Sequence, residues 1–303
     1  MKKIIIIILL IITALSTFGC KKDEEKPSDV SIITPSGTPL FALGNLLSNL
    51  ENLEIVNDPT LLQTALIKGE TDIVICPLTL GTNLYLNKKS SYKLFSVITI
   101  NNTYLVSNST ITDYNSLNNE TIVSFNENNT PGVMTKMFLS KHNITAEVIY
   151  EANVNMATQA FLSGNTNYAV VSEPQLTQIE MKKDISYIDL SDSVEADFIP
   201  QAVLFVNANK TNDSEVLKVL NQIELNVKEI QNNTSDYITT LLGTNNQFIN
   251  TLGSQVLERA LPRSNISFYK AKENKETIIQ FYNYLNETIN LFKGNIPDED
   301  FYI

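Results

Sequence analysis

Hydroxyl, amide and carboxylate side chains follow four apolar runs of the sequence, each time just before a segment of helical periodicity. The four segments are Pro35-Ser36-Gly37-Thr38-Pro39, Cys76-Pro77-Leu78-Thr79, Asn128-Asn129-Thr130-Pro131-Gly132 and Ser172-Glu173-Pro174. Proline suits the first turn of a helix because its missing N–H would be unpaired there, and a nearby hydroxyl can cap the free N–H groups. The chemistry that such residues offer is hydrogen bonding to a small molecule.

The order of these segments favours a binding site between two parts of the chain. Two segments belong to each of two successive units, and in open parallel sheets the carboxyl ends of the strands line the ligand crevice. Gly37 and Gly132 would allow close approach of the backbone. The alternative for any single segment, which is the more common case, is an ordinary helix start without a ligand. Four such segments together favour a site.

We predict the ligand contacts from these segments and a few neighbouring positions. The predicted ligand-binding residues are Ser36, Gly37, Thr38, Pro39, Pro77, Thr79, Tyr104, Asn129, Thr130, Gly132, Ser172, Glu173 and Gln201. Glu173 and Gln201 are the polar groups expected to discriminate between ligands. A second interpretation of Glu173, which we weigh equally, is a carboxylate in the first helical turn that the helix dipole stabilises.

Scarce residue types limit the chemistry further. Cys20 and Cys76 are far apart, and His142 is the one histidine, so no metal cluster of familiar spacing is expected. His142 lies in a polar stretch at a predicted helix end, where a solvated residue is the favoured interpretation over a catalytic base. We therefore predict no catalytic residue, no metal and no cofactor.

The charged residues restrict the partners. With 22 basic and 33 acidic side chains the net charge is -11, which repels phosphate backbones, so nucleic acid is not an expected partner. Arginine occurs as Arg259 and Arg263, both in the C-terminal helical part, and a bidentate clamp on a sulfonate or nitrate is not expected. Together with Glu173, this favours a neutral or amine-bearing heterocycle over a strong oxyanion.

The elements that position these residues alternate along the chain. From Val30 onward short β-branched runs alternate with helical periodicity, which is typical of parallel sheets covered by helices. From Asp213 the pattern is helical apart from 266–269. The predicted strands are 30–34, 53–56, 72–76, 94–100, 104–107, 121–125, 146–150, 168–172, 185–190 and 202–206, with Asn101-Asn102 as the turn between 94–100 and 104–107. The fold class is therefore α/β with two lobes.

The first twenty residues have the pattern of an export signal. Met1-Lys2-Lys3 precedes an aliphatic run at 4–12, which is shorter than the roughly 20 residues of a spanning helix. Gly19-Cys20 resembles the lipobox of bacterial lipoproteins, which implies a signal peptide at 1–19, a lipid on Cys20 and a charged tether at 20–28. The chain would then be extracytoplasmic, anchored to a bacterial membrane in the periplasm or at the cell surface. The alternative is an uncleaved N-terminal anchor with an incidental cysteine.

Several segments resemble the substrate-binding proteins of bacterial ABC importers, of the nitrate, sulfonate, taurine and thiamine-precursor type. They are Gly69-Glu70-Thr71-Asp72-Ile73-Val74-Ile75-Cys76-Pro77, Asn83-Leu84-Tyr85-Leu86-Asn87-Lys88, Ser172-Glu173-Pro174 and Gly294-Asn295-Ile296-Pro297-Asp298-Glu299-Asp300-Phe301-Tyr302. The resemblance runs from about Val30 to the end. One departure is Pro77-Leu78-Thr79, where the related branch has Pro-Thr-Asn and thus an amide for the ligand.

The resemblance implies a two-lobed type II periplasmic-binding-protein fold, each lobe a βα sheet flanked by helices. Residues 29–108 plus 205–303 would form lobe I and 109–204 lobe II, with hinge crossovers near Val106 and Phe205. A small organic molecule would bind between the lobes, and the closed monomer would dock on a permease with its ATPase. Two alternatives remain: an enzyme on the same fold, similar to menaquinone-pathway enzymes, or a surface lipoprotein for sensing or adhesion.

Overall fold

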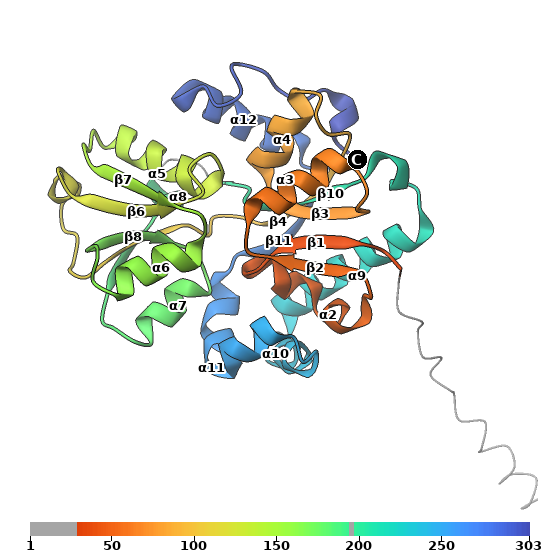
Figure 1. Ribbon diagram of the computed structural model, residues 1–303, viewed down its shortest axis with the longest axis horizontal. Helices are drawn as coiled ribbons and strands as arrows, with labels where there is room; N and C mark the ends of the chain where they lie inside the picture. The colour runs from red at the N-terminus through yellow and green to blue at the C-terminus, as the bar shows by residue number, and fades with distance from the viewer. Residues whose placement is uncertain (1–28, 194–196) are drawn as a thin grey trace, which may run out of the picture.

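Two mixed β-sheets, each covered by helices, form two lobes in the computed structural model of the chain (Figure 1). The structure describes residues 29–193 and 197–303. The predicted α/β fold with two lobes is thereby confirmed. The predicted signal peptide, the lipidated Cys20 and the tether lie outside the described residues.

Lobe I is built on a six-stranded sheet with the order β11-β4-β10-β3-β1-β2. Its strands are β1 Ile32–Pro35, β2 Leu53–Val56, β3 Ile73–Pro77, β4 Lys93–Thr99, β10 Ala202–Val206 and β11 Ile266–Lys270. β1 runs parallel to β2 and β3, whereas β10 runs antiparallel to β3 and β4, and β11 antiparallel to β4. Helices cover both faces of the sheet, which is why β3 and β10 read as continuous apolar runs in the sequence.

The helices of lobe I lie on the two faces of this sheet (Figure 1). They are η1 Thr38–Leu43, α2 Leu46–Asn49, α3 Pro59–Lys68, α4 Leu78–Leu86, η3 Ala208–Lys210, α9 Ser214–Asn232, α10 Thr234–Gly243, α11 Gln247–Arg263, α12 Lys275–Ile289 and η4 Glu299–Phe301. Ile73 and Ile75 of β3 belong to the buried cluster under α9, α10 and α11, and Val74 and Cys76 to the cluster under α3, α4 and α12. Among residues 29–193 and 197–303, none of the helices combines the length and the hydrophobicity that crossing a lipid bilayer requires.

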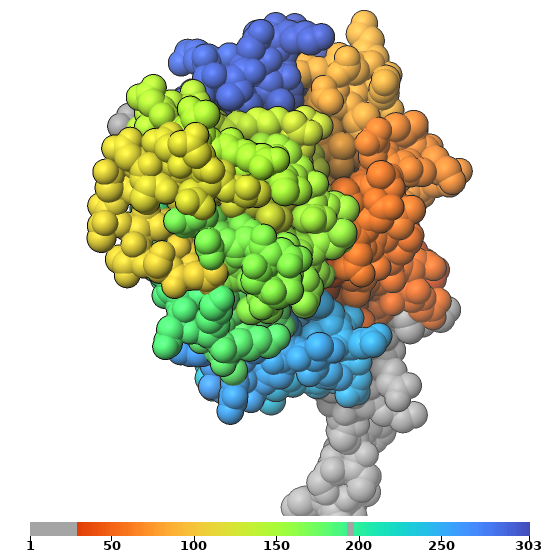
Figure 2. Space-filling model, turned by 60° about the vertical axis from the view of Figure 1, so that its left-hand side comes forward, coloured from red at the N-terminus to blue at the C-terminus, as the bar shows by residue number. Residues whose placement is uncertain are grey.

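Lobe II is built on a five-stranded sheet with the order β7-β6-β8-β5-β9. β6 runs parallel to β7 and β8, and β5 runs antiparallel to β8 and β9. The elements are β5 Tyr104–Ser107, η2 Tyr114–Leu117, β6 Thr121–Phe125, α5 Thr130–Lys141, β7 Glu147–Glu151, α6 Val154–Leu162, β8 Tyr168–Val171, α7 Gln175–Glu180, β9 Ser186–Asp189 and α8 Leu190–Ser193. In Figure 2 lobe II, in yellow and green, meets the orange surface of lobe I along a continuous seam.

The strand pairing moves both predicted lobe boundaries towards the N-terminus. β5 pairs with β8 and β9 of the second sheet, so the first crossing occupies residues 100–103 rather than the region of Val106. β10 belongs to the first sheet from Ala202 onward, so the second crossing ends before the predicted position at Phe205. The predicted turn at Asn101, which adopts φ 46, therefore joins two sheets rather than two strands of one hairpin.

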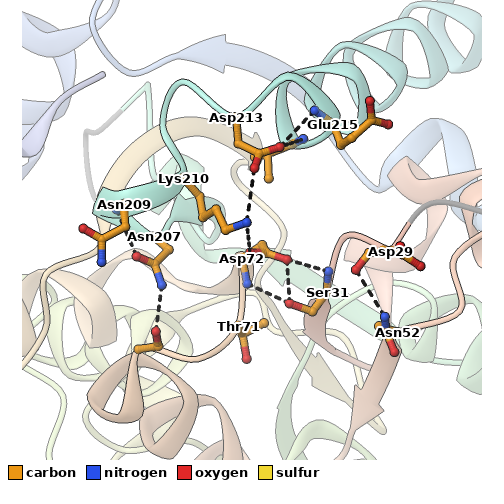
Figure 3. Close-up of polar contacts among 12 residues, drawn as sticks. Asp29, Ser31, Asn52, Thr71, Asp72, Asn207, Asn209, Lys210, Asp213 and Glu215 are labelled. Carbon is orange, nitrogen blue, oxygen red and sulfur yellow. Dashed lines mark hydrogen bonds and ion pairs between the residues drawn. The ribbon is translucent and has the colours of Figure 1, made fainter.

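A polar cluster fastens the amino ends of β1 and β3 (Figure 3). Ser31 donates to Asp72 Oδ2 through its backbone N at 2.9 Å and its hydroxyl at 2.8 Å, and Asp72 N donates back to Ser31 Oγ at 2.9 Å. Lys210 Nζ lies 3.7 Å from Asp72 Oδ1 and 3.1 Å from Asp213 Oδ2. The carboxyl ends of β1 and β3 lie at the opposite end of these strands.

Candidate functional site

A cavity of about 140 Å³ lies where the carboxyl ends of the parallel strands of both lobes meet. From lobe I it is lined by residues that follow β1 and β2 and by Pro77 at the end of β3. From lobe II it is lined by residues that follow β6, β7 and β8. This is the position expected of a ligand crevice in sheets of this kind. A cavity of roughly 150 Å³ accepts a molecule the size of benzene, so the space suits a small ligand.

Most of the predicted contact residues lie at this cavity. The lining includes Ser36, Gly37, Thr38, Pro39, Pro77, Thr130, Ser172, Glu173 and Gln201. Gly37 adopts φ 120, a conformation that favours glycine, and a Cβ added there would point into open space. The backbone can therefore approach a bound molecule closely at this point.

Four predicted contact residues lie away from the lining. Thr79 is buried within α4, and Tyr104 donates its hydroxyl to a carbonyl oxygen at the end of α11 at 3.2 Å. Asn129 precedes α5 without capping it through its side chain. A Cβ on Gly132 would lie 2.5 Å from Glu127 Cα, so this glycine admits a neighbouring turn rather than a ligand.

Two strand-to-helix corners that the sequence analysis did not select complete the lining. Asn57, Asp58 and Pro59 follow β2, and Asn153, Val154 and Asn155 follow β7. Asp58 Oδ1 accepts from Thr60 N at 2.9 Å, and Asn153 Oδ1 accepts from Met156 N at 3.1 Å, so each caps its helix. The signal in the sequence is Asp58 or Asn153 directly before a helix, whereas our prediction rests on Ser and Thr beside proline. Asn102, Asn126 and Gln175 also line the cavity and were not predicted.

A small hydrogen-bonded group joins the lobes at the cavity. Thr38 Oγ1 of lobe I donates to the carbonyl oxygen of Glu173 at 2.6 Å and accepts from Asn102 Nδ2 at 2.9 Å. Asn102 Oδ1 in turn accepts from Glu173 N at 2.8 Å. All three residues are buried, so these bonds fix the corner after β8 against the corner after β1.

The carboxylate of Glu173 points to a group of charges that we call the Arg263 cluster: Arg263, Glu173, Thr177 and Glu180. Arg263 Nη2 lies 2.7 Å from Glu173 Oε1 and donates to Thr177 Oγ1 at 2.6 Å. Both guanidinium Nη atoms contact Glu180, at 3.1 and 2.7 Å. Arg263 ends α11 of lobe I, so an arginine that we had not expected to serve either lobe's site forms an ion pair with lobe II.

The carboxylate of Glu173 is bound within this cluster and is not free to contact a ligand. Its side chain is 0% exposed, and Thr177 N donates to its Oε2 at 3.2 Å in the first turn of α7. Burial raises the pKa of Glu173, against the opposing attraction of Arg263. Glu173 thus precedes α7, and its carboxylate accepts from the first turn of that helix, while the residue also belongs to the cavity lining.

The candidate groups for other chemistry lie elsewhere. His142 follows α5, with its ring centroid 4.5 Å from that of Tyr114 and 5.0 Å from that of Phe138. Cys76 is buried in the core of lobe I, and burial raises the pKa of its thiol. In the part of the chain that the structure describes, no three His, Cys, Asp or Glu side chains are grouped so that they could hold a metal ion.

Comparison with known proteins gives structural matches alone. No protein-family model and no curated protein matches the sequence. An ABC transporter from Parabacteroides distasonis is similar with a TM-score of 0.70 and 22% identity, over 91% of this chain and 99% of that one. The ligand-binding component of an ABC-type import system from Staphylococcus aureus, with zinc bound, has a TM-score of 0.68 and 14% identity, over 90% and 95%.

A third match names a ligand class for its own protein. The alkanesulfonate-binding protein SsuA from Xanthomonas axonopodis pv. citri, bound to MOPS, has a TM-score of 0.62 and 14% identity, over 86% of this chain and 94% of that one. At these identities the matches show a shared fold. They confirm, at the level of the fold, the predicted resemblance to ABC transporter substrate-binding proteins.

Proposed function

We propose that this chain is the extracytoplasmic solute-binding component of an ABC importer, which captures a small organic molecule between its lobes and delivers it to a membrane permease. The observation that carries the proposal is the cavity itself. It is lined by strand-to-helix corners of both lobes, and its lining includes Asn102 and Gln201 from the two segments at which the chain crosses between them. A ligand held there contacts both lobes at once.

Hinge closure is the mechanism that this arrangement supports. The two crossing segments, 100–103 and the one that ends before Ala202, are the covalent links between the sheets. Residues at element ends such as these absorb the backbone rotation when domains close on a ligand. Thr38, Asn102 and Glu173 then form their hydrogen bonds across the closed interface, and the buried ligand becomes inaccessible to water.

The proposal extends to the segments at the N-terminus. A lipid on Cys20 would anchor the protein to a bacterial membrane, in the periplasm or at the cell surface, and residues 20–28 would tether the fold. The lobes would then reach a permease and its ATPase as a monomer. The corresponding test is metabolic labelling with a radioactive fatty acid, which should mark the wild-type protein and leave a Cys20→Ala variant unmarked.

An enzymatic alternative finds less support in the cavity. Its ionisable lining side chains are Asp58, which caps α3, and Glu173, which is held by Arg263. Neither carboxylate is free to transfer a proton to a bound molecule. A sensing or adhesion role with an unoccupied cleft does not explain why polar residues at the ends of five strands line one cavity.

The experiment that tests the proposal measures closure. Native mass spectrometry of the protein purified from cells identifies a co-purifying solute, and small-angle scattering then compares the protein with and without it. We expect a smaller radius of gyration in the presence of each solute that binds. Solutes that bind and leave the scattering profile unchanged would contradict the hinge mechanism.

A further inference from the structure

The polar side chains that line the cavity are almost all uncharged. Apart from Asp58 and Glu173, they are hydroxyls and amides, namely Ser36, Thr38, Asn57, Thr99, Asn102, Asn126, Thr130, Asn153, Asn155, Ser172, Gln175 and Gln201. Asp58 is exposed at the rim, and the carboxylate of Glu173 is bound within the Arg263 cluster. No lysine, arginine or histidine belongs to the lining that the described residues form.

At three of the helices that begin at the cavity, a side chain of the protein accepts from one N–H of the first turn, whereas α5 begins there without a side-chain cap. Asp58 accepts from an N–H of α3, Asn153 from one of α6, and Glu173 from Thr177 N of α7. Two of these three caps are carboxylates, which offset the partial positive charge of a helix N-terminus. An anionic ligand would meet the exposed carboxylate of Asp58 at one of these helix starts, where other folds offer it N–H donors.

The cation that contacts the lining residue Glu173 is already balanced. Arg263 lies 2.7 Å from one carboxylate oxygen of Glu173 and 2.7 Å from one of Glu180. Two carboxylates therefore surround one guanidinium, and the Arg263 cluster has no spare positive charge for a ligand. The whole chain adds to this effect with its net charge of -11.

The lining amides retain both donors and acceptors for a ligand. Asn57 Oδ1 accepts from Ser36 Oγ, and Asn155 Oδ1 accepts from Gln175 Nε2 at 2.8 Å, which leaves the Nδ2 atoms of both asparagines as donors. Gln201 Nε2 donates to Thr103 Oγ1, which leaves its Oε1 as an acceptor. Rotation of an amide about its last bond exchanges these roles but keeps the lining uncharged.

Apolar surface completes the cavity. Val56, Leu62, Phe125, Val154 and Ala202 line it together with several prolines. Such walls accept an apolar frame, and a few placed polar groups fix its orientation. From this combination we infer that the ligand is a small uncharged molecule with hydrogen-bond donors and acceptors on an apolar frame, of the kind that a heteroaromatic amide represents. The inference rests on the proposed function and departs from the alkanesulfonate of one structural neighbour.

A screen of matched solutes that differ in charge tests the inference. The full-length protein, purified in detergent, is heated with a library in which each ring frame occurs as an amide, a carboxylate, a sulfonate and a protonated amine. Nicotinamide, nicotinate, pyridine-3-sulfonate and 3-(aminomethyl)pyridine form one such set. We expect the uncharged members to raise Tm, and calorimetry to give them at least about tenfold tighter binding than their charged partners.

The outcomes separate the ligand class from the proposed function. Anions or amines that bind as tightly as the amides would overturn the inference, and closure on such a ligand in scattering would leave the importer function standing. Preferential binding of amides without closure would support the ligand class and contradict the hinge mechanism. A library without any binder counts against both.

A single added charge sharpens the test. Asn57 is exposed at the rim of the lining, so Asn57→Lys adds a cation there without burying it. We expect this variant to bind carboxylates and sulfonates several-fold more tightly than the wild type does. Asn49→Lys makes the same charge change at an exposed position of α2 outside the lining and should leave these affinities unchanged. Equal effects of the two substitutions would show that charge in the lining does not control the ligand class.

Discussion

The two lobes meet in two neighbouring zones that use different chemistry. At the cavity, Thr38, Asn102 and the main chain of Glu173 join the lobes through neutral hydrogen bonds. Beside it, the Arg263 cluster joins them through ion pairs. Glu173 belongs to both zones, with its main chain in one and its carboxylate in the other. The difference indicates that ion pairs join the lobes outside the cavity, while the side chains that face a ligand in the cavity are mostly uncharged.

Loss of the charged zone should have the largest effect. Arg263→Met leaves the carboxylate of Glu173 buried without its cation, and removal of one partner of a buried ion pair costs about 3 kcal/mol or more. We expect a decrease of that size in the free energy of unfolding, measured in urea. Arg259→Met, at an exposed position of the same helix, is the control and should change it by less than about 0.5 kcal/mol. Equal small changes in both variants would mean that the ion pairs do not hold the lobes together.

Loss of the central hydroxyl in the neutral zone should have a smaller effect. Thr38→Val removes the donor to the carbonyl oxygen of Glu173 and the acceptor for Asn102 Nδ2, and both groups are buried. Buried polar groups left unsatisfied cost about 1 to 3 kcal/mol, so we expect about 2 kcal/mol in urea unfolding. Thr64→Val, on the exposed face of α3, serves as the control. A change at position 38 no larger than this control would show that the neutral bonds are dispensable.

The backbone at the cavity should respond to an added methyl group. Gly37 adopts φ 120, so Gly37→Ala strains the chain by about 1 kcal/mol and places its methyl group in the ligand space. We expect a small loss of stability and a weaker affinity for any ligand that the screen identifies. Gly69→Ala, at φ 70 after α3, has a positive φ and open space but lies outside the lining. It should lose stability and keep its ligand affinity, and an equal loss of affinity in both variants would contradict a contact at Gly37.

The smallest predicted effect depends on pH. Burial raises the pKa of Glu173 above its ordinary value of 4.5, with Arg263 acting against the rise. The folded chain therefore binds more protons than the unfolded chain between the two values. The stability that this group contributes is full below about pH 4.5 and is lost as the pH rises through the raised pKa. The free energy of unfolding of the wild type minus that of Glu173→Gln should fall across this interval, and a flat or rising difference would show that Arg263 compensates burial completely.

The fold was predictable because its signals are local. The strands 53–56, 104–107, 121–125 and 202–206 are bounded as the apolar runs in the sequence indicate. The membership of β5 was not predictable from its own residues, because a short, largely apolar run such as Tyr104–Ser107 suits either sheet. Only the pairing of β5 with β8 and β9 assigns it to lobe II.

The site was predictable to the extent that strand ends define it. Ser36 and Ser172 lie at the cavity because the carboxyl ends of parallel strands converge there. Which residues of a strand-to-helix segment face the cavity depends on tertiary packing. Gly132, for example, lies against the backbone of Glu127 and not at the cavity. The pairing of Arg263 with Glu173 joins residues 90 positions apart through tertiary structure, which no local pattern encodes.

The strand order of lobe I determines which sheet can be completed first while the chain is synthesised. β10 lies between β3 and β4, although the whole of lobe II separates it from them along the chain. Until residues 202–206 leave the ribosome, the nascent first sheet has a gap at its centre, and β11 and its covering helices emerge later still. The strands of lobe II, by contrast, all lie within 104–189. Because domains fold as units as they emerge, the second lobe can complete its sheet before the first lobe, which begins earlier in the chain.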